Sequence, residues 1–218
     1  MNRLRLAQGI HLVRFATQYQ LAATFLRLQE HYESSRFSDR VFTLEEFMDW
    51  YAEAFGRFSY FEDWSGFNVP SKALDPFYAG LFDPLLDKER RFLDLFRDEP
   101  RPFYVLGVTE ESSRGDLRHE IAHALFTMRP AYRVAVVRAL RSYDTSPIDR
   151  QLHRLGYARH VLRDEAHAAL VAGNGSLHVP RSFDRLKEEL RAIFQEHGEQ
   201  LMKKARKPRT KRCAARTR

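Results

Sequence analysis

The sequence has 218 residues, of which 44% are hydrophobic and 30% are charged, and this suits one globular domain with a sizeable core. No apolar stretch reaches the roughly 20 residues of a membrane-spanning helix, and a single cysteine excludes an internal disulfide framework. The basic N-terminal segment lacks the continuous apolar run of a signal peptide. We therefore expect a cytoplasmic protein with no membrane span.

The net charge of +7 is concentrated at the C-terminal end. Residues 203–218 contain nine Lys and Arg and no acid, which leaves 27 basic and 29 acidic side chains and a net charge of −2 for residues 1–202. We therefore expect residues 1–202 to form a single domain and residues 203–218 to form a disordered basic tail. The tail is either a solvated end with weak nonspecific affinity, or a segment that contacts nucleic acid or an anionic membrane through phosphates.

The first part of the chain predicts a strand, two helices and a loop. Residues 9–16 predict a short strand, and Thr17 can cap the helix that follows it. The capping box Thr43–Glu46 opens a second helix, which Gly56 ends. Residues 57–82 are aromatic and irregular, so we expect a loop that either covers the core or shapes a cleft.

The rest of the chain is mainly helical in this interpretation. A third helix is expected over about 83–97, because Asp83-Pro84 is a favourable helix start. Residues 103–109 have the aromatic and β-branched composition of a buried strand. Further helices are expected over about 115–128, 130–142, 146–156 and 158–172, and a last one from about 183 into the tail. The expected fold class is α+β, mainly α, with a small N-terminal sheet.

Residues 119–123, HEIAH, fit the pattern H-E-x-x-H within a predicted helix. A helix turns by about 100° per residue, so His119 and His123 project from one side and can bind the same Zn²⁺ ion at about 2.0–2.1 Å. Glu120 lies beside that position, where a general base for a zinc-activated water belongs. The opposite helix face is apolar, which favours metal binding over two histidines that only hydrogen-bond to their neighbours.

A catalytic zinc site needs a third protein ligand, which must come from elsewhere in the chain. Glu165 is the best candidate, because it lies in the middle of an apolar, alanine-rich stripe of its predicted helix. A carboxylate in such a place is strongly destabilising unless it is paired or binds a metal. The alternative is a buried ion pair of Glu165 with Arg133 or Arg138.

Five further polar residues are weaker candidates. His160 and Asp164 are an i, i+4 pair that could orient a metal ligand or contact a substrate, but we expect His160, Asp164 and His167 to be exposed polar residues. Asp116 could orient a ligand imidazole, or could simply lie in the first helical turn, where acids are favoured. His178 stays open as a donor to a transition state.

The segments HEIAHALF and DEAHAAL resemble the two ligand-bearing helices of the gluzincins, a group of zincin metallopeptidases. The resemblance covers roughly residues 103–172. It implies a zincin-like core, in which the HExxH helix packs on the second ligand-bearing helix, and an upstream strand whose edge binds peptides, a role that FYVLGVT could fill. It also implies zinc at His119, His123 and Glu165, with Glu120 as general base and acid.

Three functions follow from these observations. The first is an intracellular zinc metallopeptidase that cleaves a peptide or protein substrate with water activated by zinc and Glu120. The second is a non-catalytic zinc-binding regulatory protein that contacts nucleic acid or a protein partner through residues 203–218. The third is a helical interaction protein without metal. The motif favours the first function, and the ligand types favour zinc over iron or manganese.

Overall fold

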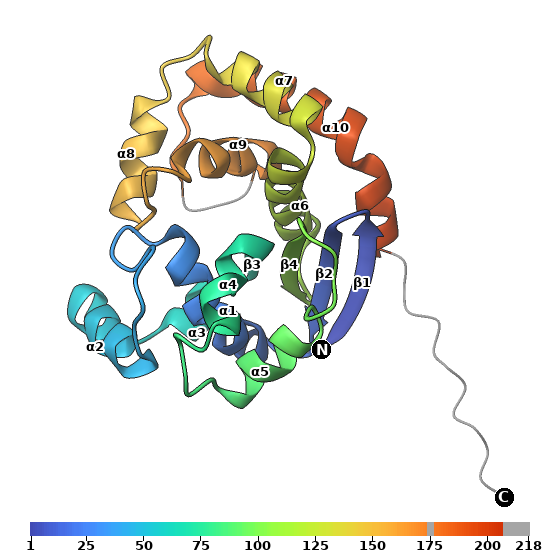
Figure 1. Ribbon diagram of the computed structural model, residues 1–218. Coiled ribbons are helices and arrows are strands. Elements are labelled where there is room, and N and C mark those ends of the chain that lie inside the picture. The colour runs from blue at the N-terminus through green and yellow to red at the C-terminus, as the bar shows by residue number, and fades with distance from the viewer. Residues whose placement is uncertain (174–176, 207–218) are drawn as a thin grey trace, which may run out of the picture.

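A computed structural model describes residues 1–173 and 177–206 of the chain (Figure 1). The fold is mixed α+β and 59% helical, with a small four-stranded sheet, so the expected fold class is confirmed at this level. Within the described ranges, every helix is too short or too polar to cross a membrane.

The sheet has the strand order β1-β2-β4-β3. Its strands are β1 Asn2–Ala7, β2 Ile10–Phe15, β3 Gly66–Pro70 and β4 Tyr104–Thr109. β2 and β4 run parallel to each other, whereas the outer strands β1 and β3 run antiparallel to their neighbours. β2 and β4 were expected, but β1 and β3 were not. β1 is mostly exposed, and β3 contains Gly, Asn and Pro, which are rare in strands, so neither has the usual apolar pattern.

The helices of the first half carry the expected caps with one exception. They are α1 Gln18–Glu33, α2 Leu44–Phe55, α3 Tyr60–Asp63, α4 Asp75–Tyr78 and α5 Asp87–Asp94, with a 3₁₀ turn at Ser71–Leu74. Thr17 and Thr43 accept hydrogen bonds from backbone amides as predicted, and Gly56 ends α2 with a φ of 81°. The predicted start of α5 at residue 83 is wrong, because the Glu89 carboxylate accepts the Leu86 amide at 2.8 Å and fixes the helix start there.

The helices of the second half are close to those predicted. They are α6 Arg114–Met128, α7 Pro130–Leu140, α8 Ser146–Arg154, α9 Leu162–Ala172 and α10 Asp184–Arg206, with a 3₁₀ turn at Arg181–Phe183. α9 begins at Leu162 rather than near 158, since the Ala158 amide bonds to the Glu33 carbonyl at 2.7 Å and ties this segment to the end of α1. α10 makes residues 203–206 helical, whereas the rest of the predicted tail, 207–218, lies outside the described residues.

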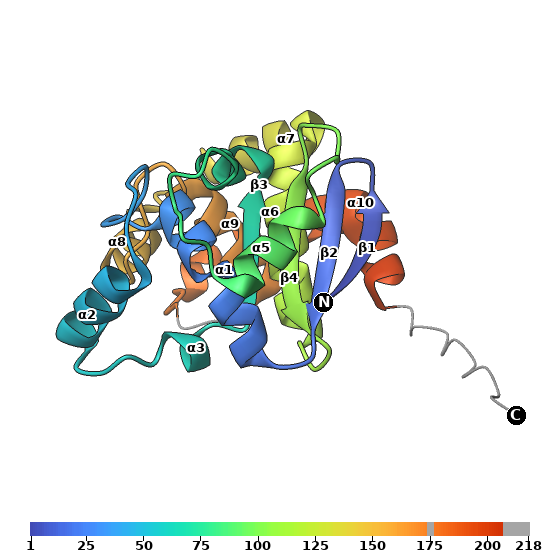
Figure 2. The same ribbon diagram turned by 60° about the horizontal axis from the view of Figure 1, so that its bottom comes forward.

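The sheet separates two hydrophobic cores (Figure 2). On one face, Leu12 and Leu106 pack in the core that α6, α7, α9 and α10 share. On the other face, Val13 and Val105 belong to a core rich in phenylalanine, to which α1 and α5 contribute. α1 approaches β4 closely at Gly107, where a Cβ atom would lie 2.8 Å from Leu21 Cδ1. This close approach fixes α1 beside the sheet, and α1 provides one wall of the site described next.

Candidate metal centre

The packed helices α6 and α9 bring the three predicted ligands together. His119 Nε2 lies 3.0 Å from His123 Nε2, and the Glu165 carboxylate lies 3.4 Å from His123 Nε2 and 3.8 Å from His119 Nε2. Four ligands placed tetrahedrally at about 2.0–2.1 Å from an ion are themselves about 3.4 Å apart. The three observed separations, 3.0, 3.4 and 3.8 Å, are centred on that value, so these three side chains could hold a metal ion.

Burial sets the protonation of these groups. Burial and the neighbouring imidazole of His123 lower the pKa of His119 to about 3, so this ring is neutral, as a metal ligand must be. Burial raises the pKa of Glu165, which is 4% exposed, to about 7. Burial alone lowers the pKa of His123, but the carboxylates of Glu165 and Asp164 outweigh it and raise that pKa. These two carboxylates therefore stabilise positive charge on His123, whereas His119 stays neutral.

The alternative of an arginine partner for Glu165 is wrong. Arg133 and Arg138 are exposed on α7, and across the described residues neither forms an ion pair with Glu165. The groups that Glu165 meets are the two imidazoles of the motif. Glu165 therefore has no arginine as counter-ion and meets the two imidazoles with which it could hold a metal ion.

Asp164 and His167 lie behind the donor set and are buried, so the expectation of exposed residues is wrong for both. They are 7% and 0% exposed. Asp164 Oδ1 lies 3.1 Å from His123 Nδ1 and 3.2 Å from His167 Nδ1. The carboxylate favours a proton on His123 Nδ1, which leaves Nε2 of the same ring free to bind a metal. Asp164 is thus placed to orient a candidate ligand, a role that the sequence left open as the less favoured alternative.

Glu120 is held next to the donor set by β3. Its side chain is 4% exposed, and its Oε2 accepts a hydrogen bond of 3.1 Å from Asn68 Nδ2. Tyr104 of β4 donates its hydroxyl to Asn68 Oδ1, which fixes the amide with its NH₂ group toward Glu120. Burial raises the pKa of Glu120 to about 8. Asn68 escaped the sequence analysis, because its strand was taken for a loop.

The strand edge beside the site belongs to β3 and not to β4. The expectation that residues 103–109 offer a free edge is wrong, since β4 pairs with β2 on one side and with β3 on the other. The amide of Ser71 donates a hydrogen bond to Phe103 O of the neighbouring strand. Because every second residue of an antiparallel strand bonds to the same neighbour, the backbone groups of Gly66 and Asn68 point away from β4. The backbone amide of Asn68, which points away from β4, donates a hydrogen bond of 2.9 Å to Gln29 Oε1 of α1.

A cavity of about 580 Å³ opens beside the donor set, which is a volume typical of ligand sites. His119, Glu120 and Glu165 lie in its wall. The remaining wall comes from α1, α2, the segment that leads into β3, and the loop after α8, which enclose the region at the left of Figure 1. The segment 57–82 therefore shapes a cleft, which was one of the two alternatives expected for it.

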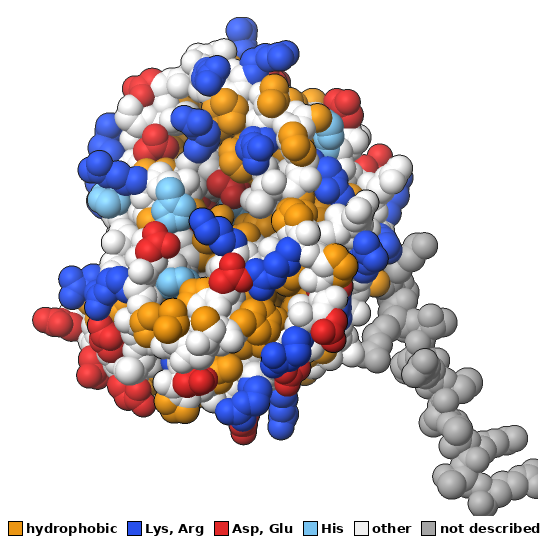
Figure 3. Space-filling view, viewed as in Figure 1, with side chains coloured by type: hydrophobic (Ala, Val, Ile, Leu, Met, Phe, Trp, Pro, Cys, Tyr) orange, Lys and Arg blue, Asp and Glu red, His pale blue; other side chains and the backbone are white. Residues whose placement is uncertain are grey.

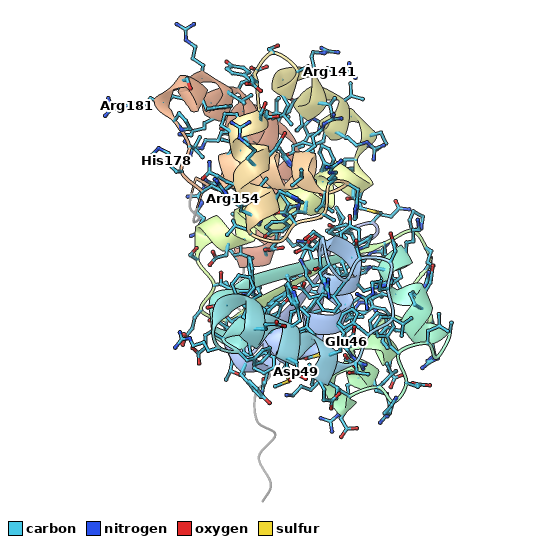
Figure 4. The ribbon with its side chains drawn as sticks, turned by 90° about the vertical axis from the view of Figure 1, so that its left-hand side faces the viewer. Glu46, Asp49, Arg141, Arg154, His178 and Arg181 are labelled. Carbon is cyan, nitrogen blue, oxygen red and sulfur yellow. The ribbon has the colours of Figure 1, made fainter. Side chains whose placement is uncertain are left out.

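Three other candidates lie away from the cavity or serve the fold. Asp116 lies in the cavity wall, but its carboxylate accepts the Ser113 amide at 2.8 Å and forms the capping box that starts α6. His160 is exposed, as expected, and contacts the Tyr32 carbonyl. His178 is exposed too and is not part of the cavity wall, and Figure 4 shows it at the outer edge of the molecule near Arg181. His178 is therefore not placed to act on a ligand in the cavity.

Comparison of the chain with family models, with curated proteins and with solved structures gave no match. The function is therefore argued from the geometry of the site.

Proposed function

We propose that the chain is a zinc-dependent hydrolase, and more specifically a metallopeptidase of the gluzincin type. One observation carries the proposal: three ligand atoms from α6 and α9 converge at the wall of a cavity, with a fourth group, the Glu120 carboxylate, beside them. His119, His123 and Glu165 would hold the ion. The two imidazoles and one carboxylate suit Zn²⁺, and three protein ligands leave one position open.

When bound there, Zn²⁺ supplies Lewis-acid chemistry, since it polarises a carbonyl oxygen and lowers the pKa of water. Glu120 is the proton acceptor in this proposal and returns the proton to the leaving amine. Burial raises the pKa of Glu120, and the positive charge of a bound ion would act in the opposite direction. Asn68 fixes the carboxylate through Oε2, which leaves Oε1 free for the proton.

Tyr157 is the candidate donor to the oxyanion of the transition state. It lies in the wall of the same cavity, and burial together with Glu165 and Glu33 raises the pKa of its phenol, which therefore keeps its proton. The backbone of Tyr157 pairs with Ser34, and its ring packs edge-to-face on Trp64 with centroids 6.2 Å apart. A hydroxyl held in this way can donate without a change of conformation.

The proposal is tested by metal content and turnover measured on the same preparations. Mass spectrometry should find about one zinc per chain in wild type and in Glu120→Gln, and little in Glu165→Ala. Hydrolysis of a peptide library should occur with wild type and should be lost in Glu120→Gln. The exposed Glu53→Gln serves as control and should match wild type in both assays. Retained hydrolysis in Glu120→Gln would contradict the role of this residue, and absence of metal from zinc-supplied wild type would contradict the site.

The second candidate function, a non-catalytic zinc protein that holds nucleic acid, rests on the basic residues at the C-terminal end. The face in Figure 3 carries Lys, Arg, Asp and Glu side chains interspersed, so it does not extend that basic segment into a broad positive surface. This alternative predicts salt-sensitive nucleic-acid binding that is lost when residues 207–218 are removed and is unchanged in Glu120→Gln.

A further inference from the structure

The wall of the cavity is acidic to an unusual degree. Six carboxylates line it, and two of them, Glu30 and Glu33, are on α1 and are neither ligands nor bases in the proposed reaction. The six are Glu30, Glu33, Asp63, Asp116, Glu120 and Glu165. The chain contains 36 Lys and Arg, yet none of the described residues in the wall is one of them. The described part of the wall therefore offers acidic groups with no Lys or Arg beside them.

Glu33 is the strongest sign that something is bound here. It is only 8% exposed and belongs to the cavity wall, and the groups that act on its charge are the carboxyls of Glu165 and Glu30, the amide of Gln29 and the imidazole of His123. Among the residues that the structure describes, no Lys, Arg or His lies within ion-pair distance of Glu33. A buried carboxyl without a cation from its own chain either stays protonated or pairs with a positive charge from outside, and the place of Glu33 in the cavity wall gives such a charge access to it.

Another acid of the same region shows what this chain does with a structural carboxylate. Glu89 is 1% exposed and is matched by the guanidinium of Arg27, which lies on α1 two turns before Glu33. The same helix therefore supplies a buried counter-ion where the acid holds the fold together. It supplies none at Glu30 and Glu33, which face the cavity.

The other side chains of the wall also suit an organic cation. Seven of them are Phe, Tyr or Trp, and the faces of aromatic rings attract ammonium and guanidinium groups. They are Trp50, Tyr51, Phe55, Tyr60, Trp64, Phe67 and Tyr157. Tyr60 hydrogen-bonds to the Glu30 carboxylate, so carboxylate and ring are held together. Aromatic walls favour an organic cation over a second metal ion, for which the described residues offer no further group of ligands.

We propose that this cavity binds a positively charged organic group of the substrate, the ammonium or guanidinium of a Lys or Arg side chain or of a free N-terminus, between α1 and the aromatic wall. Glu30 and Glu33 are the residues that recognise the charge. The inference names the substrate class of the proposed hydrolysis and in that respect rests on it. The binding of the cation can be measured without turnover.

The chain's two tryptophans, Trp50 and Trp64, both lie in the cavity wall, so their fluorescence reports binding there directly. The full-length, zinc-loaded protein is titrated with Nα-acetyl-lysine amide and, as the uncharged control of similar shape, with Nα-acetyl-norleucine amide. Norleucine amide, whose only charge is its α-ammonium group, tests the N-terminal source. We expect the lysine compound, norleucine amide, or both to bind at least about tenfold more tightly than the uncharged control. Equal affinity of all three compounds would overturn the proposal.

Glu30→Gln and Glu33→Gln keep the shape of each side chain and remove its charge, and each should weaken binding of the preferred cation by about tenfold. The exposed Glu53→Gln makes the same chemical change away from the cavity and should leave the affinity unchanged. Unchanged affinity in both cavity variants would also overturn the proposal. If the protein binds the cations but hydrolyses no peptide, the proposed function is contradicted and the inference stands. If it hydrolyses peptides equally well with and without a positive charge on the substrate, the inference is contradicted and the proposed function stands.

Discussion

The carboxylate of Glu120 occupies the space in which a side chain at Gly66 would lie. A Cβ atom built on Gly66 would fall well inside the contact distance of Glu120 Oε1 and 2.9 Å from its Cδ. The φ of Gly66 does not lie in the left-handed region, so its backbone accepts an L-residue. The glycine is therefore needed for the position of the glutamate and not for the conformation of the strand.

Gly66→Ala should displace Glu120 from its bond with Asn68 and leave the three metal ligands in place. Because a general base contributes about 10²–10⁴-fold to a rate, we expect turnover to fall by at least about a hundredfold while the zinc content stays at that of wild type. Thermal unfolding, metal analysis and peptide hydrolysis measure the three effects. The exposed Ser142→Ala, outside the cavity wall, is the control. Full activity in Gly66→Ala would mean that Glu120 acts from another position or not at all.

Asp164→Asn tests the contact behind the ligand His123. The substitution keeps the size of the side chain but removes the charge that lies 3.1 Å from His123 Nδ1. Loss of a partner that orients a metal-binding imidazole weakens metal binding by about 10–100-fold. We expect this loss in competition against a zinc chelator, with the exposed Asp184→Asn as control. Unchanged zinc affinity would show that the buried position of His123 is fixed by packing alone.

The proximity of the three residues in the candidate metal centre could be predicted because their signals are local. The spacing of His119 and His123 fixes their common side on any helix, and the apolar neighbours of Glu165 mark it as buried. Helix starts at Thr17 and Thr43 are equally local, since each depends on one hydroxyl and one amide nearby in the chain.

The remainder of the site could not be read from the sequence, because it depends on contacts between distant segments. Asn68 contacts Glu120 only once β3 has paired with β4, and β3 carries too little apolar character to indicate a strand. Asp164 shows the same limit. Its side chain is buried against His123 of α6, and the pattern of apolar residues within α9 alone does not show where α6 will pack. Tertiary packing overrides local pattern at both positions.

Breaking the buried ion pair of Arg27 and Glu89 should strongly lower the free energy of unfolding and leave the candidate metal centre unchanged. Glu89 also caps α5 through the Leu86 amide, so Glu89→Ala leaves a buried guanidinium uncompensated and removes a cap. Breaking a buried ion pair costs about 3–5 kcal/mol of unfolding free energy. Glu46→Ala, which breaks an exposed pair with Arg40, should cost less than about 1 kcal/mol. Urea denaturation at equilibrium separates the two, and equal effects would contradict the burial of the first pair.

Glu30→Gln should stabilise the protein at neutral pH. Burial raises the pKa of Glu30 in the folded chain to about 7, above its ordinary value of 4.5. The folded state therefore binds more protons, so the stability contributed by the protonated acid is complete below about pH 4.5 and is lost as the pH rises to about 7. Relative to the variant, wild type should lose about 2–3 kcal/mol of unfolding free energy between about pH 4.5 and about pH 8.

The measurement is urea denaturation of wild type and Glu30→Gln at both pH values, with Glu53→Gln as the exposed control. Parallel pH profiles of wild type and Glu30→Gln would mean that the carboxylate is better solvated than its position suggests. A variant that gains stability at neutral pH and loses affinity for organic cations would show why the acid is kept. The cavity then holds a charge that opposes folding, because that charge is complementary to a ligand.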